Sequence, residues 1–344
     1  MSNHRMRVTI SILIFALLLL PSTAFAAGRS LPKLRSLPVT SRQAAKKIPA
    51  LQVEGNHLTD GKGHTVRLKG VSTHGLAWYP QYINKKAFKR LRDDWKANTI
   101  RLALYTEEYN GYLTGGDQAA QRKLIDKGVR YATELGMYVI IDWHILNDND
   151  PGTHLKEAKS FFKTMAKKYR NHTNVLFEVC NEPHWVSWEQ DIRPYAAKIT
   201  KVIRKYNKNA VIIVGTNTWS QDVDDVIGHR LKDKNTVYTF HFYAATHGDD
   251  LRHKLESALS AGIPVFVSEC SICDASGNGG IDKASASQWF SLLDRYQVSY
   301  VAWNLSNKDE TSALINSGCS KLSGWKTSDL SDTGKWFRKR MRRK

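Results

Sequence analysis

The sequence predicts an α/β protein folded as a (β/α)8 barrel, preceded by a short β-hairpin. Short apolar segments alternate along the chain with segments whose apolar residues recur at helical spacing. This alternation indicates a parallel sheet flanked by helices. Eight such units in 344 residues favour a closed barrel over an open sheet. A doubly wound sheet is the alternative, but no glycine-rich phosphate loop follows the first strand.

Residues 1–26 have the features of a secretory signal peptide. Arg5 and Arg7 precede the apolar run Val8–Leu20, and Ala24-Phe25-Ala26 is a small-x-small cleavage site. The run is short for a spanning helix, which needs about 20 residues. An uncleaved membrane anchor is the alternative. We therefore expect a secreted, extracellular protein that is free or associated with the cell envelope.

Residues 27–49 are rich in Ser, Pro, Lys and Ala and lack periodicity, which is typical of a flexible linker. One folded domain, residues 50–344, should follow. It begins with two alternating runs between Leu51 and Leu68, which flank the turn sequence Asp60-Gly61-Lys62-Gly63. Such a pattern predicts a β-hairpin.

The barrel strands should be the apolar runs rich in β-branched and aromatic residues. Between them lie helical patterns over residues 119–136 and 157–172, the first of which ends at Gly136, a suitable C-cap. The eight predicted strands are Leu68–Val71, Thr99–Ala103, Met137–Trp143, Val175–Cys180, Ala210–Val214, Val237–His241, Val265–Ser268 and Ser299–Trp303.

The net charge of +19 is concentrated at the two ends of the chain. Residues 27–49 carry six Lys and Arg and residues 335–344 carry seven, with no acid in either segment. Basic ends suit anionic cell-envelope polymers or lipid, whereas nucleic acid is not an expected partner of a secreted chain. Solvated tails without a partner are the alternative. Trp336, Phe337 and Met341 could instead pack the last helix against the barrel.

The four cysteines do not form a metal motif. Cys270-x-x-Cys273 has suitable spacing, but no second pair completes a zinc site. Cys180 and Cys270 end apolar strands and should be small core residues. A Cys273–Cys319 disulfide is compatible with secretion, but the sequence does not establish it.

Polar and aromatic residues follow nearly every predicted strand. In a (β/α)8 barrel the active site lies at this face. Glu182 ends the fourth strand and Glu269 the seventh, so both should face the barrel axis. Paired carboxylates among aromatic rings suggest glycoside hydrolysis, a reaction that needs no metal or cofactor. Arg101 lies within the second predicted strand, and the other residues of this kind lie at or just after strand ends: His74, Trp78, Tyr105, His144, Asn181, Trp219, His241, Tyr243 and Trp303.

The segments FEVCNEP, FVSEC, HFY and WNLSNKDE resemble family 5 glycoside hydrolases of clan A, and are most similar to bacterial endo-β-1,4-glucanases. The resemblance runs from Leu51 to about Phe337. It implies that Glu182 is the general acid/base and Glu269 the nucleophile. It also implies a supporting set and a sugar-contacting set. The supporting set is Arg101, His144, Asn181, His241 and Tyr243; the sugar-contacting set is His74, Trp78, Tyr105, Trp219, Trp303, Lys308 and Glu310.

These roles lead to expectations about protonation. Arg101 and a hydroxyl donated by Tyr243 should lower the pKa of Glu269. The second carboxylate and partial desolvation should raise the pKa of Glu182. Cleavage should retain the anomeric configuration by double displacement, with the carboxyl groups about 5–5.5 Å apart. Asn181 should bind the sugar's 2-hydroxyl.

We expect a monomeric enzyme acting on β-1,4-glucan. One alternative is another β-glycanase of the same fold, such as a β-mannanase. A second is a non-catalytic protein that binds cell-wall polysaccharide, although the presence of both glutamates argues against it. Trp185 and Trp188 could contact substrate or pack in the core.

Overall fold

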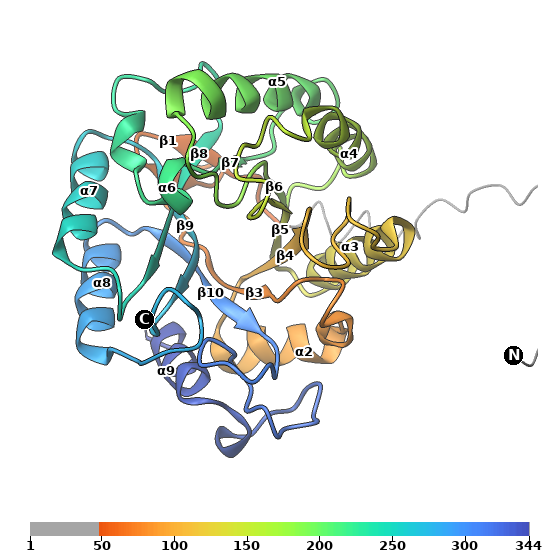
Figure 1. Cartoon of the computed structure of the whole chain (residues 1–344), viewed down its shortest axis with the longest axis vertical. Helices are drawn as coiled ribbons and strands as arrows, with labels where there is room; N and C mark the ends of the chain where they lie inside the picture. Colours follow the sequence, from red (N-terminus) through yellow and green to blue (C-terminus); the bar gives the residue numbers. More distant parts are fainter. Residues whose placement is uncertain (1–47, 344) are drawn as a thin grey trace, which may run out of the picture. The chain divides into compact units, whose positions relative to one another are not determined.

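Eight parallel strands close into a barrel in the order β10-β3-β4-β5-β6-β7-β8-β9 (Figure 1). The computed structural model describes residues 48–343, so the predicted signal peptide and almost all of the linker lie outside the described residues. The predicted (β/α)8 fold is confirmed. The strands are β3 (Lys69–Thr73), β4 (Thr99–Tyr105), β5 (Tyr138–His144), β6 (Val175–Glu178), β7 (Ile212–Val214), β8 (Thr236–Tyr243), β9 (Val265–Ser271) and β10 (Ser299–Leu305).

Most strands extend further toward their carboxyl ends than the apolar pattern indicated. Tyr243 belongs to β8 and Glu269 to β9, and the register pairs His241 with Glu269. Polar residues that looked like loop positions are therefore paired within the barrel, where Glu269 is buried and Tyr243 is half-buried. β7 and β6 are the exceptions: β7 ends at Val214 as predicted, and β6 ends at Glu178, four residues before Glu182.

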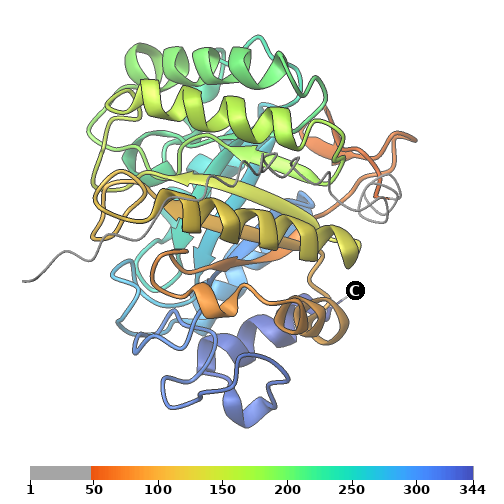
Figure 2. The same ribbon diagram turned by 90° about the vertical axis from the view of Figure 1, so that its right-hand side faces the viewer.

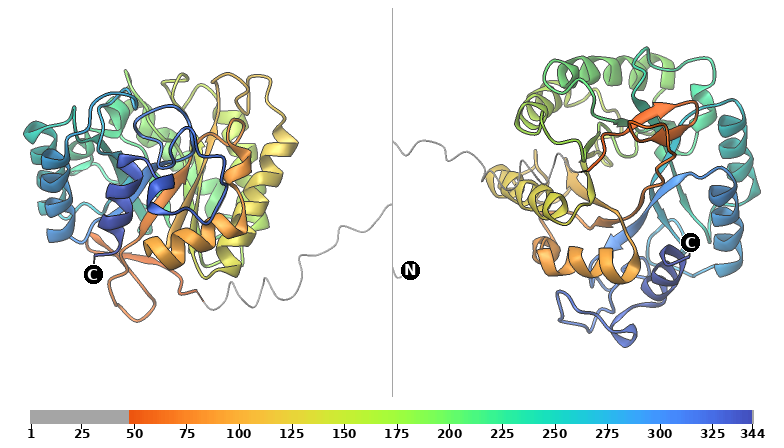
Figure 3. Two further views of the ribbon diagram at one scale, coloured as in Figure 1. Left: turned by 90° about the horizontal axis from the view of Figure 1, so that it is seen from below. Right: turned by 180° about the vertical axis from the view of Figure 1, so that it is seen from behind.

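Helices cover the outside of the barrel (Figures 1 and 3). Asp117 caps α3 by accepting from the amide of Ala120, and Gly136 with φ of 71° follows its last turn, as predicted. The helices are α2 (Lys85–Arg90), α3 (Gln118–Glu134), α4 (Leu155–Lys168), α5 (Arg193–Arg204), α6 (Asn217–Ser220), α7 (Asp249–Ser260), α8 (Lys283–Arg295) and α9 (Asp332–Met341). None of the helices within residues 48–343 is both long and apolar enough to cross a bilayer.

The predicted hairpin turn forms, and a second, tighter turn precedes it. β1 (Gln52–Glu54) pairs with β2 (His57–Thr59) around Gly55, whose φ is 62°. At the predicted turn the Gly63 amide donates to the Asp60 carbonyl at 3.0 Å. The flanking residues pair through the bridge Thr59–Thr65 and through the bond from the Val66 amide to the Leu58 carbonyl at 2.8 Å. Glycine adopts a positive φ without steric cost, so Gly55 and Asn56 make the tighter two-residue turn.

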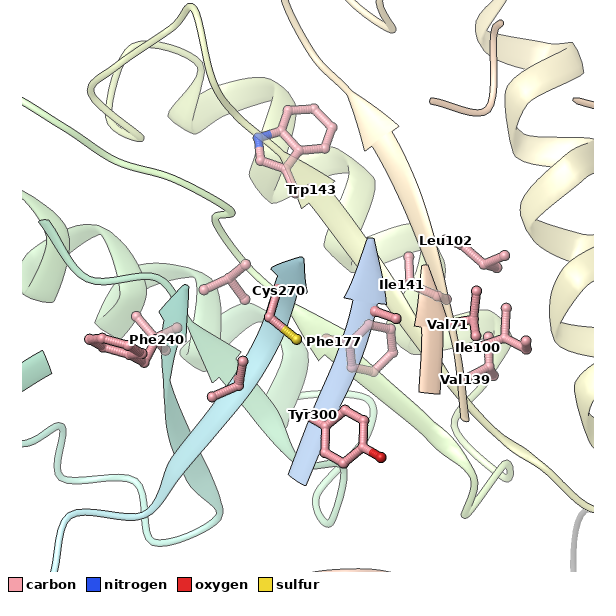
Figure 4. Packing of buried hydrophobic residues seen from close by; sticks show 14 of the residues in the cluster. Val71, Ile100, Leu102, Val139, Ile141, Trp143, Phe177, Phe240, Cys270 and Tyr300 are labelled. Carbon is pink, nitrogen blue, oxygen red and sulfur yellow. The ribbon is translucent and has the colours of Figure 1, made fainter. Parts of the chain in front are cut away.

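The core lies largely between the barrel and its helices (Figure 4). A second cluster joins Leu51 and Leu58 of the hairpin region to Tyr138 and Phe266 of the barrel strands. Cys180 and Cys270 are buried core residues, as predicted. All four cysteines are free, so the disulfide that the sequence left open is absent.

The C-terminal helix is part of the fold rather than a free tail. Phe337 and Met341 are buried, and α9 lies beside the α2 segment (Figure 2). Arg338 donates two hydrogen bonds to the Asp94 carboxylate, from Nε at 2.7 Å and from Nη2 at 3.0 Å, and Arg340 forms an ion pair with Asp294. Several cations of this basic segment therefore serve packing, whereas Lys339, Arg342 and Arg343 stay exposed.

Candidate active site

A cleft of about 610 Å³ opens at the carboxyl ends of the barrel strands. Arg101 and Asn181 are fully buried and hydrogen-bonded to each other at 2.6 Å rather than lining this cleft. The structure thus gathers all of the predicted site residues around one space. The predicted residues that line it are His74, Trp78, Tyr105, His144, Glu182, Trp219, His241, Tyr243, Glu269, Trp303, Lys308 and Glu310.

Glu182 and Glu269 face each other across this cleft. One carboxylate oxygen from each, together with a ring nitrogen of His241, lies within 4.8 Å of the others. Only 14% of the Glu182 side chain is exposed, and 5% of that of Glu269. Neither glutamate is therefore a surface ion pair. Burial of two close carboxyl groups favours a state in which they share a proton.

Glu269 has a hydrogen-bond donor on each oxygen. Arg101 Nη1 lies 3.0 Å from Oε2, and the Tyr243 hydroxyl lies 2.7 Å from Oε1. Both predicted contacts are present, but the predicted direction of the pKa shift is wrong. Burial and the neighbouring Glu182 raise the pKa of Glu269, and this outweighs the lowering by His241 and Arg101.

Glu182 is surrounded by fewer donors. Its Oε1 lies 2.8 Å from Nδ1 of His241. Burial, reinforced by Asp142 and Glu178, raises the pKa of Glu182 to about 8. The predicted rise is confirmed, although its main cause is burial. Because Glu269 has two donors and Glu182 has one neighbouring ring nitrogen, we place the shared proton on Glu182.

A buried layer beneath the cleft includes three residues that sequence reasoning missed. Arg101 contacts Glu178 through Nε at 2.7 Å and Asp142 through Nη2 at 3.1 Å. Ser268 donates to Glu178 at 2.6 Å. Asp142 and Glu178 carried a readable signal, because each is an acid inside an otherwise apolar strand. Ser268 carried none.

Asp142 also orients the predicted pair His144 and Asn181. The Asp142 carboxylate lies 2.6 Å from Nδ1 of His144. Asn181 donates to Nε2 of His144 and to the Ile145 carbonyl, both at 3.2 Å. Burial lowers the pKa of His144 well below its usual value, so this imidazole is neutral. Both amide hydrogens of Asn181 are thus engaged by groups of the protein itself.

Aromatic rings line one wall of the cleft. Trp78 and Tyr105 have ring centroids 4.5 Å apart, and Trp303 is 5.3 Å from His74. Glu310 lies near them, where it pairs with Lys308 at 2.6 Å. All of the predicted sugar-contacting residues except Trp219 therefore lie together in this part of the cleft.

Trp219 lies on another wall, stacked on His184 at 4.4 Å. Trp185 meets the same pair edge-on and is 80% exposed, with φ of 56°. Trp188 is buried, and its indole donates to the His229 carbonyl. The sequence left open whether these two tryptophans contact substrate or pack in the core. Trp188 packs in the core, whereas Trp185 is available to a ligand.

Among residues 48–343, one group of three side chains could present ligand atoms to a metal ion: Glu182, His241 and Glu269. A pKa of about 8 keeps Glu182 protonated at neutral pH, and a protonated carboxyl group is a poor ligand. We therefore assign no metal to this group.

Comparison with known proteins agrees with this geometry. The family model "Cellulase (glycosyl hydrolase family 5)" matches residues 59–309. Endoglucanase A of Butyrivibrio fibrisolvens is 47% identical over 290 residues, which cover 83% of this chain and 67% of the relative. Endoglucanase N of Pectobacterium atrosepticum is 45% identical over 293 residues, 85% of this chain and 65% of the relative. The chain thus spans about two thirds of the length of these relatives.

Solved structures show the same likeness. The catalytic domain of Thermobifida fusca endoglucanase Cel5A superposes with a TM-score of 0.82 at 34% identity, covering 87% of this chain and 99% of that one. A variant of that domain was solved in complex with cellotetraose, with a TM-score of 0.80. On the family match, the close relatives and the shared barrel, the chain belongs to glycosyl hydrolase family 5, the cellulases.

Proposed function

We propose that this chain is an endo-β-1,4-glucanase that cleaves internal glucosidic bonds with retention of the anomeric configuration. One observation carries the mechanism: oxygens of Glu182 and Glu269 lie within 4.8 Å of each other. Retaining enzymes hold their carboxyl groups about 5–5.5 Å apart, whereas inverting enzymes need about 6.5–9.5 Å to admit a water molecule. The spacing supports the retaining mechanism.

In the first step, Glu182 donates its proton to the glycosidic oxygen as the bond to the anomeric carbon breaks. Glu269 attacks that carbon from the opposite face and forms a glycosyl ester. In the second step, Glu182 takes a proton from water, and the oxygen of this water displaces Glu269. Arg101 and Tyr243 hold the carboxylate of Glu269 in place for attack. A sugar 2-hydroxyl could replace one of the 3.2 Å bonds of Asn181.

A β-1,4-glucan is the substrate class that the site supports best. Trp78, Tyr105 and Trp303 provide aromatic rings on one wall of the cleft, and Trp219 provides one on another wall. The curated relatives are endoglucanases, and the cellotetraose complex belongs to a structurally similar domain. Secretion through residues 1–26 belongs to the proposal as well, and N-terminal sequencing of the exported protein should begin at Ala27.

The test is sugar release by the purified protein from carboxymethylcellulose, barley β-glucan and mannan, with Glu269→Ala beside it. We expect hydrolysis of the glucans and its loss in the variant. Activity on mannan alone would overturn the substrate. NMR of the first products should show the β-anomer. An initial α-anomer would overturn retention. No hydrolysis by a folded protein would favour the binding alternative.

A further inference from the structure

Ser268 lies behind the acid/base residue and is fully buried. Its hydroxyl is 2.6 Å from Oε1 of Glu178 and 2.9 Å from Nε2 of His241. The opposite ring nitrogen of His241, Nδ1, is 2.8 Å from Oε1 of Glu182. A continuous line of hydrogen bonds therefore joins Glu178, Ser268, His241 and Glu182.

The number of available protons decides which group donates in each hydrogen bond of this chain. Arg101 holds Glu178 with two parallel bonds, from Nε at 2.7 Å and Nη2 at 3.2 Å. Burial and the neighbouring Asp142 raise the pKa of Glu178, whereas this fork-to-fork pairing with a permanent cation opposes the rise and favours the carboxylate, which is the form we assign. An ionised Glu178 can only accept, so the single hydroxyl proton of Ser268 points to it. The Ser268 oxygen then faces His241 as an acceptor.

The same count fixes the tautomer of His241. Since the Ser268 oxygen accepts, Nε2 of His241 must carry the proton, and Nδ1 of the neutral ring carries a lone pair. Burial lowers the pKa of His241 to about 4, so the ring is neutral near pH 7. The contact between Nδ1 and Glu182 is then a hydrogen bond only when Glu182 is protonated. The Thr239 hydroxyl contacts Ser268 too and also lies 2.9 Å from the Phe266 carbonyl. In our assignment Thr239 turns its one hydroxyl proton to the second lone pair of the Ser268 oxygen, because the proton of Ser268 itself is held by Glu178.

We propose that Ser268 is a positioning residue, which fixes the Nε2–H tautomer of His241 and so keeps the proton on Glu182 until the glycosidic bond breaks. This inference rests on the proposed role of Glu182 as the general acid. It adds a reason for the protonation state beyond burial, because the ionised carboxylate would face a lone pair.

Other charged groups also face Glu182 and His241, and they must be held constant in a test. Arg101 favours the ionised form of Glu182, whereas the acids favour the protonated one. Ser268→Ala leaves all of these side chains in place. The groups are Arg101 and Tyr105 on β4, Asp142 and His144 on β5, Glu178 on β6, Tyr243 on β8, His247 after β8 and Glu269 on β9.

The first experiment is 15N NMR of the histidine rings in the substrate-free protein, with the His241 signals identified by their absence from His241→Gln. We expect a proton on Nε2 and none on Nδ1. A proton on Nδ1 would overturn the proposal without any variant of Ser268. The tautomer of His241 can be measured in an inactive protein. Its outcome is therefore distinguishable from a failure of the proposed function, which is tested by glucan hydrolysis by the wild type.

The second experiment is the same spectrum and the pH profile of kcat/KM for Ser268→Ala. Without the hydroxyl, His241 can place its proton on Nδ1 and donate to ionised Glu182. The alkaline limb of the profile should move down by about one pH unit, the size of shift expected when the charged form gains a hydrogen bond. Ser268→Thr should restore both the tautomer and the limb.

Ser299→Ala is the matched control, because Ser299 is a buried serine that accepts from the Leu68 amide, away from the cleft. It should change neither the tautomer nor the limb, and equal melting temperatures of the two alanine variants would match them for stability. An unchanged tautomer or an unchanged limb in a folded Ser268→Ala would overturn the proposal.

Discussion

The Tyr243 hydroxyl lies 2.7 Å from Oε1 of Glu269, and Arg101 occupies the other oxygen of the same carboxylate. The nucleophile is therefore held from both sides although it is buried. Oriented donors of this kind stabilise charge in a site that excludes water.

Removing the donor in Tyr243→Phe should lower kcat/KM by about 10²–10³, by analogy with the loss of one oriented donor elsewhere. Loss of a hydrogen bond to the charged form raises the pKa of Glu269 further. The acidic limb of the pH–rate profile should therefore move to higher pH. Tyr206→Phe, at a half-buried tyrosine that follows α5 and does not line the cleft, is the control. An acidic limb that stays in place would contradict this role of Tyr243.

The raised pKa of Glu182 predicts a pH-dependent cost in stability. The group binds a proton in the folded protein up to about pH 8, but its usual value is 4.5. Between these values the folded state holds more protons than the unfolded state, so stability falls as pH rises. From about 1.4 kcal/mol per pKa unit, the cost between pH 5 and pH 8 is at most roughly 4 kcal/mol.

Glu182→Gln removes this titration. The variant should lose activity, and it should gain stability relative to the wild type as the pH rises from 5 to 8. Chemical denaturation at both pH values measures the difference. A constant difference between the two proteins would show that Glu182 does not titrate in this window.

Trp185 should extend the binding surface beyond Trp219. Trp185→Ala should leave the melting temperature nearly unchanged, since the side chain is 80% exposed. We expect kcat/KM on long glucans to fall about ten-fold, which corresponds to about 1.4 kcal/mol. Short oligosaccharides that do not reach Trp185 should be cleaved as before.

Trp188→Ala is the natural partner of that variant. This indole is buried, and its loss should cost about 3–5 kcal/mol of stability. Equal losses on short and long substrates for Trp185→Ala would remove the idea of a sugar platform.

Gly215 lets two backbones approach beneath the acid/base loop. A Cβ on this residue would lie 2.6 Å from the Cys180 carbonyl oxygen and 2.9 Å from that of Asn181. Gly215→Ala should therefore displace the loop that carries Glu182 and reduce kcat far more than Gly318→Ala, whose Cβ would meet nothing within 4 Å. Steady-state kinetics of the two variants test this, and equal kcat values would refute it.

The exposed cations near the C-terminus are a proposed contact for anionic cell-envelope polymers. The variant Lys339→Gln/Arg342→Gln/Arg343→Gln should bind cell-envelope preparations more weakly than the wild type at low salt. The difference should vanish at high salt, because such attraction is screened. Arg338→Gln is the contrasting variant: it breaks the pair with Asp94 and should lower stability instead. If the triple variant binds as strongly as the wild type, these cations do not bind the cell-envelope polymers.

The sequence alone determined the barrel, the two glutamates and most of the cleft lining. Hydrophobic periodicity is a local property, so the alternation of strands and helices is readable along the chain. In a closed parallel barrel the carboxyl ends of all strands meet at one face, and this places Glu182 and Glu269 together. The turn at Asp60–Gly63 was readable as well, but the additional pairing of β1 with β2 around Gly55 was not, because two glycine-containing turn sequences lie within ten residues of each other and only the folded pairing shows that both are used.

Tertiary structure decided the protonation of the site. Arg101 and Glu269 are 168 residues apart, and Ser268 and Glu178 are 90 apart, so no local pattern reports their bonds. The pKa of Glu269 is raised because desolvation outweighs the attraction of Arg101, and desolvation depends on how completely the folded chain excludes water. Similarly, the packing of α9 decides which cations of the basic C-terminal end form ion pairs with Asp94 and Asp294. Residue types set which charges exist, but burial and non-local contacts set which of them are ionised and free.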